Sequence, residues 1–454
     1  MTNASGENEI KERRLVLDMK SSRRLAADFT SIGLSQGIAA LGQVVGIRIL
    51  TEALSPAVFG EVSLMLGVAA LAATALCNPT MQALLRFSPE YVQPADLSLL
   101  KRVALKRILK MFTLALPLSL PLGAFGTMKG WFGGLDVLLL AALVFVDASR
   151  MLQTTVMNAS RRHYRFGAWQ VGEAWARPLA AYTAVTLWGI GTSTVLSSFV
   201  AASGILYLIM VRLNPDSVCF TGNTQAKEDD LFQKFATYSR PLIPLGLIAW
   251  TSGMADRYMI GWLLSAKAVG LYVAAYGLAS RPMLMLSTVT ELVIRPVYYS
   301  ALGRRDAAGS NKFLVLWFVI VCTVGGLAWG MFALCHQQIA SLLLGPEFRE
   351  ASSLMPWIAA GYGFLALSHI PTRVCYAHDA TRVVLICEVV TAAMSVAVGF
   401  PLIYFYGLLG GAVAVPVYFS IQLLLSTGFA TIIARRDANA AGKSLYDAGR
   451  LSCV

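Results

Sequence analysis

Apolar runs of about 20 residues recur from one end of the chain to the other, with short polar stretches between them. An α-helix needs roughly 20 apolar residues to cross the hydrocarbon core of a bilayer. The pattern therefore predicts an all-α polytopic membrane protein with about twelve transmembrane helices. We place them at residues 27–49, 61–85, 105–126, 135–157, 168–188, 193–212, 238–264, 270–297, 313–335, 354–375, 382–405 and 409–433.

Composition agrees with this class. Of the 454 residues, 56% are hydrophobic and only 14% are charged, whereas a soluble domain carries about 25% charged residues. The net charge of +12 would suggest nucleic-acid binding if it covered a soluble surface. Here the basic residues lie at the ends of apolar runs, where they set topology and contact anionic lipid. We expect membrane lipids as partners and no nucleic acid.

The basic residues also predict the orientation of the chain. With the N-terminus inside, the loops and tails on the inner side carry most of the lysines and arginines. The outer edges carry only Arg48, Lys129, Lys267 and Arg349. Because basic residues accumulate in cytoplasmic loops, we predict a multi-pass protein with both termini in the cytoplasm.

Reporter fusions test this orientation. A reporter that is active only in the cytoplasm should give a signal when it is fused after Lys443. A reporter that is active only outside the cytoplasm should give a signal when it is inserted near Lys129. A cytoplasmic signal at Lys129 would contradict the arrangement of twelve helices.

A weak internal repeat divides the chain. The pattern Leu-Ser-x-x-x-apolar-Gly occurs at residues 54–60 and again at residues 264–270, where we expect a tight turn. Six predicted helices separate the copies, and an even number preserves orientation, so we predict two parallel six-helix lobes with a site between them. The predicted division is a cytoplasmic N-terminal arm (1–24), an N-lobe (25–213), a cytoplasmic linker (214–234), a C-lobe (235–434) and a cytoplasmic tail (435–454).

Several short segments, in order and at matching spacing, resemble a known family. They are residues 50–60 (LTEALSPAVFG), 85–91 (LRFSPEY), 256–261 (DRYMIG), 269–272 (VGLY), 344–348 (LGPEF) and 406–412 (YGLLGGA). In these the chain resembles the Wzx-type polysaccharide flippases of the multidrug/oligosaccharidyl-lipid/polysaccharide exporter superfamily. The related lipid II flippases usually have fourteen helices, so twelve argue against that branch.

The resemblance implies a function. Two six-helix lobes would move a polyprenyl-diphosphate-linked oligosaccharide from the inner to the outer leaflet of the bacterial cytoplasmic membrane by alternating access, with helices 1, 2, 7 and 8 lining the cavity. The product would serve surface polysaccharide synthesis (O-antigen, capsule or exopolysaccharide). The lipid-linked oligosaccharide would be the main partner, and a polysaccharide polymerase and chain-length machinery are candidate partners.

Arginines within the spans are the candidate residues for the diphosphate, because a guanidinium keeps its charge and binds phosphate in a bidentate manner. Arg257 and Arg281 are the first choices, since no acidic residue lies three or four positions away. Arg48 and Arg295 are further candidates, although Glu52 and Glu291 lie one turn from them and could neutralise them.

Other buried charges have two possible roles. Asp256, Asp147, Glu173 and Glu388 could couple transport to protons or sodium, or only balance arginines. Asp147 with Arg150, and Glu173 with Arg177, stand at same-helix spacing. The sequence alone leaves both roles open. It predicts no cofactor, no metal site and no catalytic residue, because no nucleophile, phosphate-loop or metal-ligand spacing occurs.

Two alternatives share parts of this pattern. A multidrug exporter of the same superfamily would have the same fold, but a cavity for organic cations should be acidic. A membrane-bound polysaccharide polymerase would be an enzyme, and the longest outer loop, near residues 336–353, is short and lacks a convincing catalytic set. We therefore predict a transporter and not an enzyme.

Overall fold

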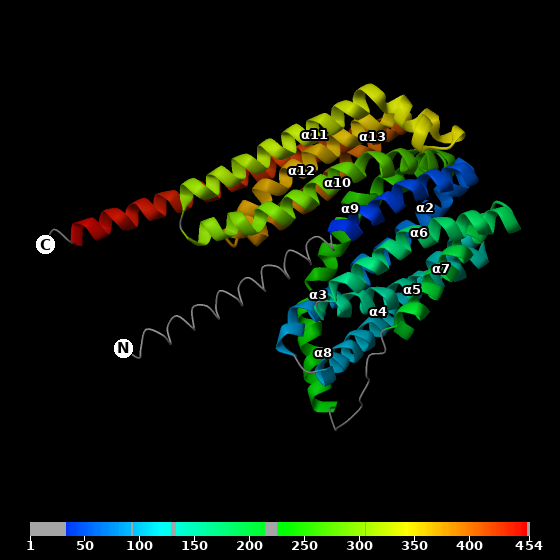
Figure 1. Cartoon of the computed structure of the whole chain (residues 1–454), viewed down its shortest axis with the longest axis horizontal. Helices are drawn as coiled ribbons and strands as arrows, with labels where there is room; N and C mark the ends of the chain where they lie inside the picture. Colours follow the sequence, from blue (N-terminus) through cyan, green and yellow to red (C-terminus); the bar gives the residue numbers. More distant parts are fainter. Residues whose placement is uncertain are drawn as a thin grey trace, which may run out of the picture. The chain divides into compact units, whose positions relative to one another are not determined.

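The computed structural model describes residues 33–91, 94–128, 133–160, 162–213, 225–304 and 306–451, and the regular structure in these residues is helical throughout (Figure 1). The predicted N-terminal arm (1–24) and the first part of the predicted linker lie outside them. The first described helix is Gly33–Ala53. The next are α2 (Pro56–Ala72) and α3 (Asn78–Phe87), joined by a π-helical turn (Ala73–Cys77), α4 (Pro94–Met128), α5 (Gly134–Ala159), α6 (His163–Trp188) and α7 (Thr192–Leu213).

The second half begins with a short polar helix, α8 (Gln225–Ser239). It is followed by α9 (Leu242–Leu263), α10 (Ala266–Gly303), α11 (Ala307–Leu343), a 3-10 segment (Pro346–Leu354), α12 (Met355–Ala377) and α13 (Thr381–Leu451). Gly407 has φ +60° and breaks α13 into two helices. With α2 and α3 taken as one rod and α13 as two, the described residues contain twelve long helices, which confirms the predicted all-α fold.

Six of the described helices are long and apolar enough to cross a membrane by length and composition alone. They are Gly33–Ala53, Pro56–Glu90, Thr192–Leu213, Ala266–Gly303, Ala308–Leu343 and Thr381–Arg436. The last of these contains the break at Gly407, which allows it to cross twice.

The predicted turn at residues 264–270 is shorter than expected. Leu264 ends α9, and the Ser265 side chain accepts a hydrogen bond from the backbone N–H of Ala268 at 3.2 Å. This cap allows α10 to begin at Ala266. In the first copy of the repeat, Pro56 occupies the start of α2 directly after Ser55, a position that suits proline because no helical N–H bond is lost. In each copy the glycine therefore lies inside a helix.

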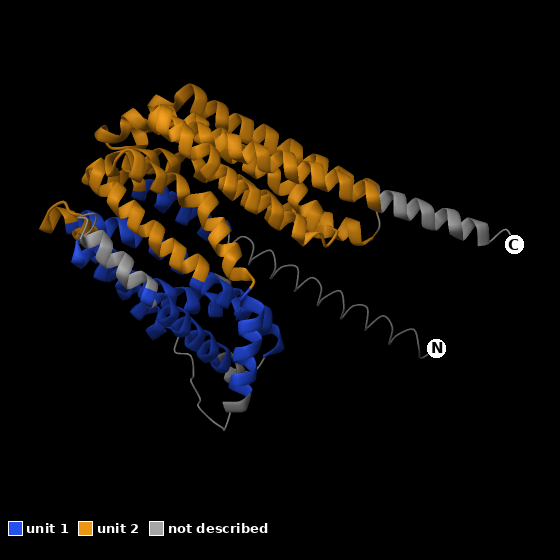
Figure 2. Ribbon diagram, turned by 180° about the vertical axis from the view of Figure 1, so that it is seen from behind, with its two compact units in different colours: residues 1–46, 76–184, 196–240 blue, residues 47–75, 185–195, 241–454 orange. Residues whose placement is uncertain are grey.

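The chain forms two compact units, which Figure 2 distinguishes by colour. Unit 1 comprises residues 1–46, 76–184 and 196–240, and unit 2 comprises residues 47–75, 185–195 and 241–454. Residues 47–75, from the first part of the chain, thus belong to the same unit as α9 to α13. The units do not follow the predicted boundary between lobes.

Within unit 2, α2 and α10 pack at the two glycines of the repeat. A Cβ atom on Gly60 would overlap the carbonyl oxygen of Ala266, and one on Gly270 would overlap that of Pro56. Glycine is needed at both positions because the two backbones approach this closely. The two copies of the repeat are therefore packed against each other.

Helix α9 is attached to α2 by two side chains. The Tyr258 hydroxyl donates to the Leu64 carbonyl at 2.7 Å, and the Trp250 indole N–H donates to the Gly67 carbonyl at 2.8 Å. These bonds fix the rotation of α9 about its axis, and with it the direction in which Asp256 and Arg257 point.

Within unit 1, α8 packs on α3 and α4. Leu231 and Phe235 of α8 are fully buried in a cluster with Leu84, Leu100 and Val103. The last part of the predicted linker is therefore an anchored amphipathic helix. The predicted tail from residue 435 continues α13 as a helix to Leu451.

Candidate functional site

Asp256 and Arg257 lie in the second half of α9, beside the start of α10. The buried carboxylate of Asp256 accepts hydrogen bonds from the Tyr272 hydroxyl at 2.6 Å and from the backbone N–H of Arg257 at 2.8 Å. Both donors are neutral. Asp256 and Arg257 are adjacent in the sequence and could have formed an ion pair. In the structure their side chains do not pair.

The Arg257 guanidinium lies against an aromatic wall. Its central carbon is 4.7 Å from the centre of the Tyr276 ring, and one terminal nitrogen is 2.7 Å from the sulfur of Met254. Tyr276 in turn shares a hydroxyl–hydroxyl hydrogen bond with Tyr362 of α12. A ring face and a thioether stabilise a cation only weakly. The buried Nε of Arg257 has no hydrogen-bond partner, so this guanidinium retains a free donor.

Arg281 lies further along α10 and has no anionic partner among the described residues. Its Nε is buried without a hydrogen-bond acceptor, and the positive charge of Arg257 acts on it. Two arginines within electrostatic reach of each other share this region with one carboxylate, Asp256, whose hydrogen bonds come from neutral donors, so positive groups outnumber negative ones. We call Asp256, Arg257, Tyr276, Arg281 and Tyr362 the arginine site.

The other two arginines predicted to bind diphosphate are paired. Arg48 binds the Glu52 carboxylate at 2.7 Å and donates to the carbonyl oxygen of Leu344, which ties the first described helix to the segment before the 3-10 turn. Arg295 binds Glu291 at 2.8 Å, and Glu291 also binds Arg373 of α12 at 2.8 Å. The structure therefore separates Arg48 and Arg295 from the unpaired Arg257 and Arg281.

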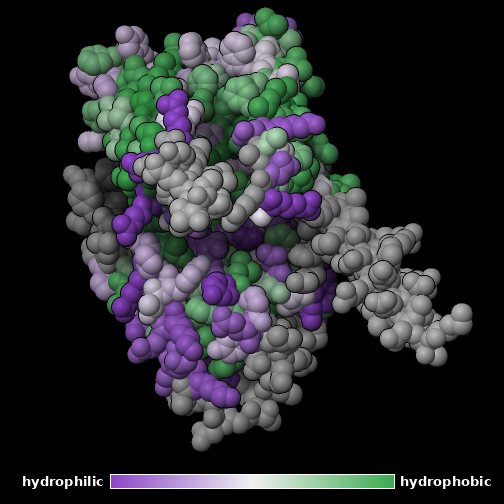
Figure 3. All heavy atoms as spheres, turned by 90° about the vertical axis from the view of Figure 1, so that its left-hand side faces the viewer, coloured by the Kyte–Doolittle hydropathy of each residue, from purple (hydrophilic) through white to green (hydrophobic). Residues whose placement is uncertain are grey.

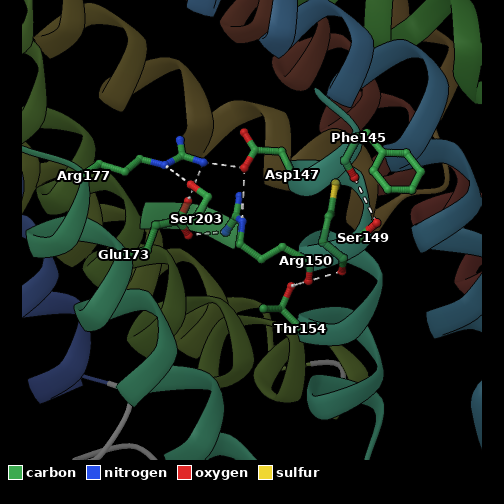
Figure 4. Close-up of polar contacts among 9 residues, drawn as sticks. Phe145, Asp147, Ser149, Arg150, Thr154, Glu173, Arg177 and Ser203 are labelled. Carbon is green, nitrogen blue, oxygen red and sulfur yellow. Dashed lines mark hydrogen bonds and ion pairs between the residues drawn. The ribbon is translucent and has the colours of Figure 1, made fainter. Parts of the chain in front are cut away.

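In unit 1, Asp147, Arg150, Glu173 and Arg177 form one network with Ser203 (Figure 4). The closest contacts run between helices: Arg150 of α5 binds Glu173 of α6, and Arg177 of α6 binds Asp147 of α5. The same-helix contacts that the sequence predicts are present but longer, at 3.4 Å for Arg150 with Asp147 and 3.3 Å for Arg177 with Glu173. Long arginine side chains reach the neighbouring helix, which sequence spacing does not reveal. The network therefore contains two carboxylates and two guanidinium groups, whose charges cancel.

Glu388 lies apart from both groups. Its carboxylate accepts a hydrogen bond from the side-chain amide of Gln422 at 3.1 Å, which links the two halves of α13. No basic side chain binds Glu388 in the part of the chain that the structure describes.

Sequence reasoning missed the neutral side chains of the arginine site. Tyr272 and Tyr276 stand one turn apart on α10, a spacing that could have marked a shared face toward α9. Tyr362 comes from α12 and gave no local signal. Glu61 was also missed: its carboxylate accepts a hydrogen bond from Thr192 at 2.5 Å, which links α2 to the start of α7.

A family model described as "Polysaccharide biosynthesis protein" matches residues 25–301. The match begins before the first described helix and ends near the C-terminus of α10, and therefore includes Asp256, Arg257 and Arg281. No curated protein matches the chain.

Solved structures with a similar fold are transporters. An inward-facing multidrug resistance transporter of the MATE family, in the MOP superfamily, is 12% identical, with a TM-score of 0.67 over 87% of this chain and 95% of that one. The lipid II flippase MurJ, in an inward closed conformation, is 12% identical, with a TM-score of 0.67 over 87% and 86%. A MOP-superfamily transporter from Pyrococcus furiosus, described as having a binding pocket of reversed polarity, is 14% identical, with a TM-score of 0.58 over 90% and 95%.

Proposed function

Because the chain belongs to the polysaccharide biosynthesis protein family and has the multi-pass fold of the MOP-superfamily transporters, we propose that it is a flippase for lipid-linked oligosaccharides. Its substrate is a polyprenyl-diphosphate-linked oligosaccharide, moved from the inner to the outer leaflet of the bacterial cytoplasmic membrane. The translocated unit then enters the synthesis of an O-antigen, a capsule or an exopolysaccharide. Both termini lie in the cytoplasm.

The arginine site is the observation that carries this proposal. A charged side chain inside a membrane span costs roughly 2.5–3.5 kcal/mol on insertion scales, and Arg257 and Arg281 bear that cost without an acidic partner among the described residues. A diphosphate supplies the missing anion through charge-assisted, bidentate hydrogen bonds. An organic cation, the cargo of the alternative multidrug exporter, would be repelled.

Alternating access is proposed to use the predicted lobes, residues 25–213 and 235–434. The close packing of α2 on α10 at Gly60 and Gly270 supports a closed outer side, because both copies of the repeat stand at predicted outer turns. Arg48, on the helix before α2, makes a further contact on the predicted outer side through its bond to the Leu344 carbonyl. Opening to the outside then requires α2 and α10 to separate.

A crosslink tests this movement. Cysteines replacing Ser55 and Ser265, each next to the Gly60–Gly270 contact, should form a disulfide under oxidising conditions and reduce export, which should recover on reduction. The measurement is surface polysaccharide together with the mobility of the protein after proteolytic cleavage within residues 214–224. Normal export by the fully crosslinked protein would show that these turns do not separate.

Transport by the purified protein tests the function itself. In proteoliposomes, the protein should move a polyprenyl-diphosphate oligosaccharide between leaflets, as measured by its accessibility to an added glycosidase. A polyprenyl-monophosphate sugar, which carries less charge, should move more slowly. Transport of an organic cation without transport of the lipid-linked sugar would favour the multidrug exporter.

A further inference from the structure

Arg107 of α4 is buried, and no acidic side chain of the described residues pairs with it. Arg107 is 3% exposed, and its Nε has no hydrogen-bond partner. Leu100, Val103 and Ala104 lie on the same side of α4 at helical spacing, and each is at most 1% exposed. The side chain therefore starts on the covered face of α4. A buried charge without a partner strongly destabilises the folded protein. Binding of an anion at Arg107 would remove this destabilisation.

Two of the three acidic residues of α8, which packs on α4, form ion pairs, and the third, Asp229, is exposed to solvent. Glu228 is almost fully buried and binds Lys106 at 2.5 Å and Arg102 at 3.7 Å. Asp230 binds Lys234 at 2.7 Å. Arg240, just beyond the end of α8, acts on Arg107 through its positive charge. Among the described residues, no ion pair joins Arg107 or Arg240 to an acidic side chain.

The part of α4 that is buried by other parts of the protein ends close to Arg107. Leu114 lies on the same side of α4, two turns further on, because seven residues return a helix to nearly the same direction. It is 64% exposed. Toward the other end of the helix, hydrophilic side chains gather over the lower part of the face in Figure 3, at the height at which Figure 1 draws α8. Arg107 thus lies between the covered part of α4, which includes Leu100 and Val103, and the exposed Leu114.

We propose that Arg107 and Arg240 bind a phosphate group, the headgroup phosphate of an anionic phospholipid whose acyl chain lies along α4 past Leu114. Arginine suits this ligand because its planar fork matches phosphate oxygens. Basic clusters at the cytoplasmic end of transmembrane helices bind anionic headgroups, and Arg107 lies near that end of α4 in the proposed orientation. This lipid site is separate from the arginine site and from the transported substrate.

Thermal unfolding of the purified full-length protein in detergent tests the site. The ligands are phosphatidylglycerol, phosphatidylcholine and inorganic phosphate, titrated into the natural protein, Arg107→Gln, Arg240→Gln and the control Arg86→Gln. Arg86, like Arg240, is exposed to solvent, but it pairs with Glu90 at 3.1 Å. A ligand that binds only the folded protein raises Tm, and the rise grows with the logarithm of its concentration above Kd.

We expect phosphatidylglycerol, but not phosphatidylcholine, to raise the Tm of the natural protein and of Arg86→Gln. Arg107→Gln should need at least about tenfold more phosphatidylglycerol for the same rise, the loss expected for a charge-assisted contact. Without lipid, its Tm should equal or exceed that of the natural protein, because the substitution removes an unpaired buried charge. A residue with only a structural role would lower Tm.

The comparison of the three ligands also shows whether the bound phosphate belongs to a lipid or is free in solution. If inorganic phosphate gives the same Arg107-dependent rise and phosphatidylglycerol adds nothing beyond phosphatidylcholine, the site binds soluble phosphate and the lipid assignment is wrong. If Arg107→Gln responds to both ligands as the natural protein does, the site does not exist. Should Arg107→Gln fail to fold, an unchanged response of Arg240→Gln overturns the proposal equally.

Discussion

Alanine at Arg257 or Arg281 is expected to abolish polysaccharide export while the protein remains in the membrane at its normal level. Each charge-assisted hydrogen bond contributes about 1.5–3 kcal/mol, so losing one guanidinium should weaken diphosphate binding by roughly 10- to 100-fold. Insertion should not suffer, because removing a charge from a span makes insertion easier. Neither substitution breaks a hydrogen bond to an acid, since Asp256 keeps its bonds to Tyr272 and to the backbone.

Lysine separates charge from geometry at the same two positions. Arg281→Lys should restore export only in part, because an ammonium keeps the charge and loses the planar fork. The measurement is surface polysaccharide in a deletion strain that carries each variant, normalised to the amount of protein in the membrane.

A matched control is Arg295→Ala. Arg295 is on the same helix as Arg281, but its side chain is 41% exposed and its partner Glu291 would keep Arg373. We expect near-normal export from this variant. Full export by the double alanine variant at 257 and 281 would remove the arginine site from consideration.

The order and number of the helices could be predicted because apolar runs of membrane-spanning length stand out in the sequence. Their ends were less accurate. At residues 264–270 the predicted turn included the first residues of α10, because the capping by Ser265 begins the helix within two residues of the end of α9. The last part of the predicted linker forms α8, whose buried Leu231 and Phe235 stand at helical spacing that the polar residues between them obscured.

The candidate site could be predicted only as far as one helix determines it. The absence of an acid one turn from Arg257 and Arg281 was visible in the sequence, and both lack an anionic partner among the described residues. Partners from other helices were not visible. Tyr272, rather than Arg257, binds the Asp256 side chain, and Arg150 makes its closest contact with Glu173 of the next helix. Such pairs depend on helix rotation, which tertiary packing sets.

The sequence also could not predict that residues 47–75 belong to unit 2. The repeat shows that residues 54–60 and 264–270 are alike, but likeness does not show that they touch. The contact depends on the backbone overlap that any side chain at Gly60 or Gly270 would create. Two equivalent turns that pack on each other are what a closed outer side requires under the proposed mechanism.

Alanine at Arg177 should have a different effect from alanine at Arg257, because it should remove the protein and not only its activity. Arg177 is about one-fifth exposed and is the closest partner of Asp147. Glu173 would keep Arg150, whereas Asp147 would keep only its 3.4 Å contact with that same arginine. The network in Figure 4 would then hold two acids and one base.

Removing one member of a buried ion pair costs about 3–5 kcal/mol, a large fraction of the stability of most proteins. We therefore expect Arg177→Ala to reduce the amount of folded protein in the membrane several-fold, measured by immunoblot and by size-exclusion chromatography of the detergent extract. Export per molecule of the remaining folded protein should stay close to normal.

A double substitution shows whether charge balance is the cause. Asp147→Asn together with Arg177→Met removes one acid and one base and leaves Arg150 with Glu173, so it should restore much of the protein that Arg177→Ala or Arg177→Met loses. The coupling energy of this double-mutant cycle measures the pair directly. Normal protein levels in both Arg177 variants would show that the network does not stabilise unit 1. A normal level with lost export would instead place Arg177 in substrate binding or ion coupling, the role that the sequence left open for this group.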